Sequence, residues 1–165
     1  MYKRQHKAIN FVFLIALPMM LYFMIFAKEG IFFLSGSAYE KSILPMQVIM
    51  PTLLFIGLTN VMGIQMLVPL GKEKIVLYSE IAGAVVDLIV NFALIPRYAS
   101  VGAAIGTLAA EIVVWVVQFG ALKQDIMPAY KKIQYPQMLL ALVIGCVASV
   151  WVKMLGWNSF FVLLL

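Results

Sequence analysis

Apolar residues of this chain gather in long runs that are separated by short polar segments. A helix needs about 20 mostly apolar residues to cross a bilayer. Five runs reach that length: Ala8–Ala27, Ile43–Leu70, Ile75–Ile95, Val101–Leu122 and Pro136–Leu155. A sixth run, Ser159–Leu165, is too short to cross, so we expect the printed sequence to end inside a helix. The pattern predicts an all-α integral membrane protein, a polytopic bundle of about five complete transmembrane helices with a truncated sixth.

Composition supports a membrane protein and excludes several kinds of chemistry. Hydrophobic residues make up 64% of the chain and charged residues 12%, whereas soluble domains average about 45–50% and about 25%. The single cysteine, Cys146, and the single histidine, His6, allow neither a disulfide framework nor a His/Cys metal site. No Ser–His–acid set and no Gly-rich phosphate loop is present. We therefore predict a protein that is not an enzyme and holds no cofactor or metal; a membrane enzyme acting with carboxylates alone is the alternative.

The basic residues predict the orientation of the spans. The net charge is +5, but the basic residues lie in short loops, as membrane topology requires, and we expect no nucleic-acid partner. With five spans, one side collects Lys3, Arg4, Lys7, Lys72, Lys74, Lys123, Lys131 and Lys132, and the other Lys28, Lys41, Arg97 and Lys153. The side richer in Lys and Arg is normally cytoplasmic. The N-terminus and the Gly71–Lys74 turn are therefore predicted to be cytoplasmic.

Several residues interrupt or shape the predicted helices. Pro18 lies in the middle of the first span and Pro51 about two turns into the second, and each leaves a backbone carbonyl without its helical partner. The Lys28–Ser42 connection is predicted to be an interfacial turn. Gly102 and Gly106 have the small-xxx-small spacing that lets another helix approach closely.

Polar residues within the spans are the candidate functional residues. Asp87 and Asn91 lie one helical turn apart in the middle of the third apolar run and share a face with Glu80. In the fourth run, Glu111 forms a similar stripe with Ala104, Thr107 and Gln118. A carboxylate at this depth costs roughly 2.5–3.5 kcal/mol on insertion scales. Asp87, Asn91 and Glu111 are thus candidates for binding a substrate or ion. A structural, hydrogen-bonding role is the alternative for each, and for Glu80 and Gln118 it is the preferred one.

The stretch from Asn91 to Thr107 resembles a family pattern. It is similar to N-x-x-L-I-P-x-Y-G-x-x-G-A-A-x-A-T, which is characteristic of polysaccharide biosynthesis flippases, the O-antigen and exopolysaccharide exporters of the multidrug/oligosaccharidyl-lipid/polysaccharide superfamily. The matched positions are Asn91, Pro96, Gly102, Ala103, Ala104 and Thr107. Ala99 stands where the family usually has Gly, and Gly106 where it usually has Ala. In the family these positions serve packing and the helix turn more clearly than substrate contact.

The resemblance implies a fold, a partner and a cargo. Such flippases have two six-helix lobes around a cavity, often with two further helices. Residues 1–125 would be four later helices of the second lobe, and residues 126–165 the start of the extra pair. The N-terminal lobe would be a missing partner, and the substrate an undecaprenyl-diphosphate-linked oligosaccharide moved by alternating access across the bacterial inner membrane.

Two other functions remain open from the sequence. One is a cation- or proton-coupled multidrug exporter of the same superfamily, in which Asp87 would be the coupling site. The other is a noncatalytic membrane protein that assembles or anchors a glycan-synthesis complex.

Overall fold

The computed structural model describes residues 2–130 and the isolated positions 140, 143 and 147, and every regular element in this part of the chain is helical. The α-helices are α1 (Tyr2–Ile25), α2 (Ala27–Ser35), α3 (Ile43–Ile49), α4 (Thr52–Met62), α5 (Glu73–Tyr98) and α6 (Ser100–Tyr130). A 3₁₀ helix, η1 (Ser37–Ser42), precedes α3, and a π-helix, η2 (Gly63–Leu67), follows α4.

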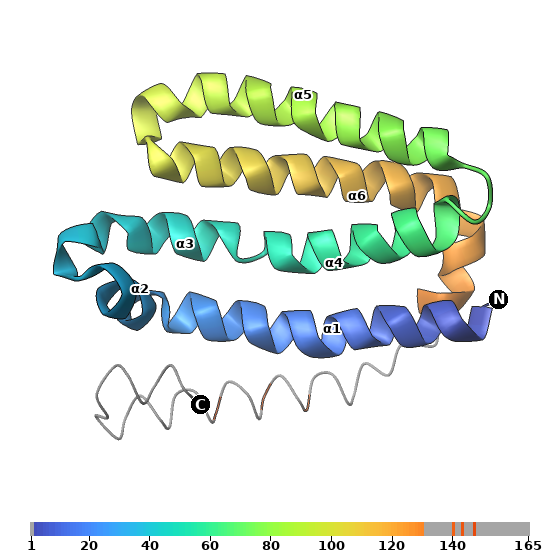
Figure 1. The fold of residues 1–165 in the computed structure, drawn as a ribbon, viewed down its shortest axis with the longest axis horizontal. Helices are drawn as coiled ribbons and strands as arrows, with labels where there is room; N and C mark the ends of the chain where they lie inside the picture. Colours follow the sequence, from blue (N-terminus) through green and yellow to red (C-terminus); the bar gives the residue numbers. More distant parts are fainter. Residues whose placement is uncertain (1, 131–139, 141–142, 144–146, 148–165) are drawn as a thin grey trace.

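The long helices lie side by side in a row, in which α1 is antiparallel to the α3–α4 rod and α5 to α6, whereas the α3–α4 rod and α6 run in the same direction (Figure 1). Helix α1 packs against α4, the α3–α4 rod packs against α6, and α6 packs against α5. Helix α6 therefore has neighbours on two sides, whereas α5 lies at the edge of the row. The N-terminus lies at the same end as the α4–α5 connection, and α2 lies at the opposite end. This arrangement leaves α5 with one face against α6 and, near its start, contacts with η2, while its side away from α6 carries exposed residues such as Leu88 and Phe92.

Four helical segments of the described chain are long and apolar enough to cross a membrane: Lys7–Ile25, Ser37–Leu67, Glu73–Tyr98 and Ser100–Lys123. They correspond to the first four predicted spans. Helix α5 begins two residues before the predicted span, and α6 continues past its predicted end to Tyr130. The expected division after residue 125 falls within α6. The predicted fifth span, Pro136–Leu155, and the short run Ser159–Leu165 lie outside the described residues, apart from positions 140, 143 and 147.

Prolines and a glycine divide the first half of the chain. Proline lacks the N–H that would continue the helical ladder, and Pro51 separates α3 from α4 as predicted. Pro18, in contrast, lies inside the single helix α1. The sequence predicted an interfacial turn for the Lys28–Ser42 connection. In the structure this connection instead folds into the helices α2 and η1. Gly36 separates these two helices with a φ of 83°, a conformation that glycine adopts at little cost.

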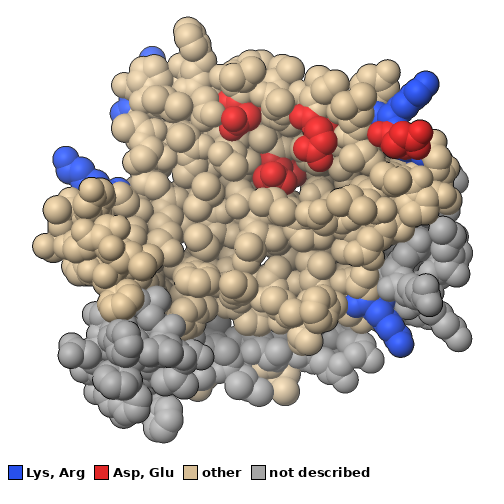
Figure 2. Space-filling model, viewed as in Figure 1, with Lys and Arg blue, Asp and Glu red and all other residues tan. Residues whose placement is uncertain are grey.

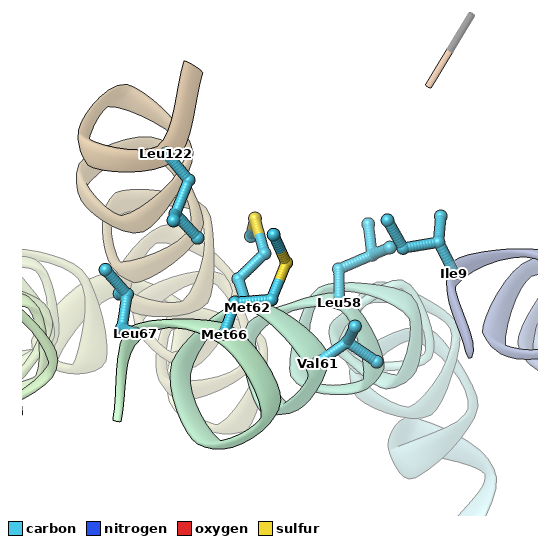
Figure 3. Packing of buried hydrophobic residues seen from close by; sticks show 7 residues of the cluster. All are labelled: Ile9, Leu58, Val61, Met62, Met66, Leu67 and Leu122. Carbon is cyan, nitrogen blue, oxygen red and sulfur yellow. The ribbon is translucent and has the colours of Figure 1, made fainter. Parts of the chain in front are cut away.

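The main hydrophobic core joins α1, α4, η2 and α6. Figure 3 shows its fully buried members, which are Ile9, Leu58, Val61, Met62, Met66, Leu67 and Leu122. Met62 and Met66 are each 1% exposed. Flexible, unbranched methionines fill irregular gaps in such cores, so these two side chains serve packing in this structure.

The α5–α6 turn has an unusual backbone. Ala99 connects the two helices with a φ of 49°. Only glycine adopts positive φ freely, because a Cβ crowds the backbone there. The flippase pattern that residues 91–107 resemble usually has glycine at this position. An alanine here strains the backbone of the turn, although both residues are small.

Candidate functional site

Small residues make a close seam between α5 and α6. A Cβ atom added to Gly102 would lie 2.7 Å from the backbone carbonyl of Leu94 in α5. A Cβ added to Gly83 in α5 would lie 2.6 Å from the Val114 side chain and 3.2 Å from the Ala110 carbonyl oxygen in α6. The predicted small-xxx-small contact at Gly102 and Gly106 is thus present, and its partner is α5. The seam fixes the rotation of α5 relative to α6.

Asp87 and Asn91 lie on this seam, against Gly106. A Cβ added to Gly106 would collide with the carboxamide oxygen of Asn91 and would lie 3.1 Å from Oδ1 of Asp87. Both residues are half-buried, but Oδ1 of each is buried and has no hydrogen-bond partner among the described residues. Gly106 therefore makes the space for these two polar groups, and an alanine at this position would not fit the present side-chain arrangement.

Glu111 lies in α6 near the Glu80 side chain of α5. Since Gly106 faces Asp87 and Asn91 while Gly83 faces Ala110 and Val114, Glu111 is level with a point between Glu80 and Asp87. Glu111 is half-buried and close enough to Glu80 for their carboxylates to interact electrostatically. The structure thus brings Glu111 of the α6 stripe near Glu80 of the α5 stripe.

These carboxylates form an acidic face, defined by Glu80, Asp87 and Glu111, in which Asp87 and Glu111 lie near the middle of their spans and Glu80 lies seven residues from the start of its span. Figure 2 shows acidic groups over α5 and α6; the more central ones are surrounded by uncharged surface, whereas basic groups lie toward the ends of the bundle. Asp87 lies 14 residues after the start of α5 and 11 before its end, which is about 21 and 17 Å along the axis. None of the three has an ion-pair partner within residues 7–123. The acidic face is therefore uncompensated in this part of the chain.

A buried hydrogen bond joins α5 to α6 at Ser79, the residue that precedes Glu80. Nε2 of Gln118 donates to Oγ of Ser79 at 3.0 Å, and that hydroxyl donates to the Val76 carbonyl at 2.7 Å. Gln118 is 1% exposed, and its side chain also lies against Gly63, where the π-helix begins. The structural role predicted for Gln118 is confirmed. Sequence reasoning missed Ser79, since a lone serine in an apolar run carries no signal of its partner.

The remaining motif residues support the helices and their ends. Ala104 is buried, and Thr107 donates a hydrogen bond to the Ala103 carbonyl of its own helix at 3.2 Å. Pro96 lies exposed in the last turn of α5. No described residue of this motif other than Asn91 adds a polar group to the seam at Gly106. Their roles here are packing and helix geometry.

Within the described residues, no group of three or more His, Cys, Asp or Glu side chains is arranged to hold a metal ion. The fold and the polar face define a helical bundle whose long helices have the length and composition of membrane spans. No family model, curated protein or solved structure matches the chain.

Proposed function

We propose that this chain is the C-terminal part of a flippase that moves a polyprenyl-diphosphate-linked oligosaccharide across the bacterial inner membrane. The observation that carries the proposal is the polar group of Asp87, Asn91 and Glu111 at mid-span on the α5–α6 pair. Ionisable residues at this depth are costly and mark substrate or ion paths more often than simple anchors do. The proposal that the cargo is a lipid-linked oligosaccharide comes from the resemblance of residues 91–107 to flippases.

The arrangement suits movement by alternating access. In that mechanism one helical lobe moves against another around a central site. Helix α5 lies at the edge of the row of helices, so the acidic face can line an interface with a second lobe. The α3–α4 rod is broken at Pro51. The broken rod and the π-helix next to it are places where such a bundle bends.

The orientation proposed from the sequence agrees with this arrangement. Lys7, Lys72, Lys74 and Lys123 lie toward the N-terminal end of the bundle, whereas Lys28, Lys41 and Arg97 lie toward the opposite end. An excess of basic residues at the N-terminal end supports a cytoplasmic N-terminus.

The experiment is translocation of a lipid-linked oligosaccharide by the full-length protein in liposomes. Outward movement is measured by the access of an added glycosidase to the glycan. We expect wild-type protein to translocate and Asp87→Leu to lose translocation while inserting normally, because the substitution removes an insertion penalty. Leu88→Ala, an exposed α5 neighbour, is the matched control. A wild-type protein that moves no lipid-linked glycan refutes the proposal.

A second candidate is a proton- or cation-coupled exporter, favoured by the buried Oδ1 of Asp87 that has no partner among the described residues. A carboxylate oxygen left in this state can bind a proton or a cation. Asp87→Asn distinguishes a coupling role because it keeps the shape and hydrogen bonding but loses the charge. Gradient-driven export of cationic dyes that disappears in Asp87→Asn, with glycan translocation absent from the wild type, would select the exporter.

A further inference from the structure

The acidic face is incompatible with contact to lipid tails. Asp87 and Glu111, at mid-span, are half-buried, and Glu80, nearer the start of its span, is exposed, so the acidic face extends from the α5–α6 seam to the surface of the bundle. Each carboxylate left against hydrocarbon costs roughly 2.5–3.5 kcal/mol. The neighbouring α5 surface is apolar, with Phe92 89% exposed. The figure applies to the centre of a span, so Asp87 and Glu111 together make contact with lipid tails unfavourable, and we expect protein or water to cover this face in the membrane.

The described spans contain no cation that could compensate these acids. Their basic residues are Lys7, Lys41, Lys74, Arg97 and Lys123, each within four residues of an end of its span. Asp87 and Glu111, in contrast, lie 11 or more residues from the ends of theirs. A second copy of the chain would therefore bring carboxylates against carboxylates at this depth, which is unfavourable when both are charged.

We propose that the acidic face is a docking surface for a transmembrane segment that carries a Lys or Arg side chain at the middle of its span. Charge complementarity selects this partner, because pairing with an opposite charge lowers the cost of keeping both groups in hydrocarbon. The apolar side chains around the acids fit the rest of such a helix. The inference goes beyond transport of a glycan, since it specifies what covers α5 and α6 whatever the cargo is.

The seam gives the docking surface a fixed position. Gly83 and Gly106 hold α5 against α6, so Ala84 lies exposed between Glu80 and Asp87 on the same face. Val85, the next residue, is 49% exposed and points about 100° further around the helix. Ala84 and Val85 therefore form a matched pair of positions, at the same depth but in different directions.

The test places a photoreactive diazirine amino acid at Ala84 or at Val85 of the full chain in its native membrane. We expect Ala84 to give a protein adduct that maps to an apolar segment with a Lys or Arg near its middle, and Val85 to give mainly lipid adducts. The Ala84 adduct should be lost in the variant that combines Asp87→Asn with Glu111→Gln. The charges are then exchanged: in a chain that keeps Asp87→Asn, Glu111 is replaced by Lys and the partner's basic residue by Glu. This exchange should restore the Ala84 adduct.

Three outcomes would overturn the inference. They are an adduct to a second copy of α5 or α6, an adduct to a segment without a basic residue, and no protein adduct at Ala84. The last outcome means that lipid or water covers the face. The crosslink does not depend on translocation, so failure of the glycan assay and failure of this test are separate results.

Discussion

Replacing Gly102 by alanine tests whether the α5–α6 seam is as close as the structure shows. The new Cβ would lie 2.7 Å from the carbonyl carbon and oxygen of Leu94 and 2.9 Å from the Ile95 nitrogen. Ordinary contact begins near 3.4 Å, so the two helix backbones must separate by about 0.7 Å. These are backbone atoms, which no rotamer change can move aside. Forcing extra atoms into a packed interface costs about 1–3 kcal/mol.

Gly120 is the matched control for this substitution. It lies in the same helix, and a Cβ there would meet nothing within 4 Å. In a helix interior alanine is a better helix former than glycine by roughly 0.8–1.0 kcal/mol. Gly120 is interior, whereas Gly102 is the third residue of α6 and gains less. The difference between Gly102→Ala and Gly120→Ala therefore contains the overpacking cost and a smaller contribution from helix propensity.

The assay is unfolding of the purified protein in mixed micelles at increasing SDS fraction, followed by far-UV circular dichroism. We expect Gly102→Ala to have an unfolding free energy about 1–3 kcal/mol below that of Gly120→Ala. Gly106→Ala should lie between them, since its close neighbours are side-chain atoms of Asn91 and Asp87, which can rotate. Equal stability of Gly102→Ala and Gly120→Ala would refute a close backbone contact at Leu94.

Two further substitutions test the turn and the buried hydrogen bond. Ala99→Gly should stabilise the protein by up to about 1–2 kcal/mol in the same assay. It relieves the positive φ of 49°, a strain of about 1–3 kcal/mol, and the greater entropy of glycine in the unfolded chain offsets part of this gain. A loss of stability would mean that the turn does not hold this conformation. Ser79→Ala should destabilise more than Gln118→Leu. The serine variant leaves the Gln118 amide buried without its acceptor, whereas Gln118→Leu also removes an oxygen that has no partner among residues 7–123. The reverse order would contradict this account.

The spans were predictable because their signal is local. An apolar run of about 20 residues identifies a spanning helix wherever it packs, and Pro51 breaks the α3–α4 rod by its own chemistry. The small-residue spacing at Gly102 and Gly106 predicted a close helix but not which one. The π-helix at Gly63 had no such local signal, because Gly63 lies against Gln118 and Val76 of other helices; the helical form of residues 27–42 was not predicted either.

The candidate site was predictable in its residues and unpredictable in its geometry. Depth in an apolar run selected Asp87, Asn91 and Glu111, since burial cost depends mainly on position along the span. Their relation across α5 and α6 depends on the register of the pair. That register is set by contacts such as Gly106 with Asn91 and Gly83 with Val114, which involve residues about 15 to 30 positions apart. The sequence pattern of one helix cannot specify it.

The close seam and the acidic face depend on each other. A rotation of α5 by one residue position, about 100°, would take Asp87 away from Gly106 and change which carboxylates reach the surface. The glycines therefore stabilise more than a helix pair, because they fix the direction in which the costly acids point. This explains why polar groups lie directly over the smallest residue of α6: Gly106 accommodates Asp87 and Asn91 without moving the helices apart, and leaves Glu80 and Glu111 at the edge of the seam. A function of the acidic face would then constrain the packing residues as strongly as the acids themselves.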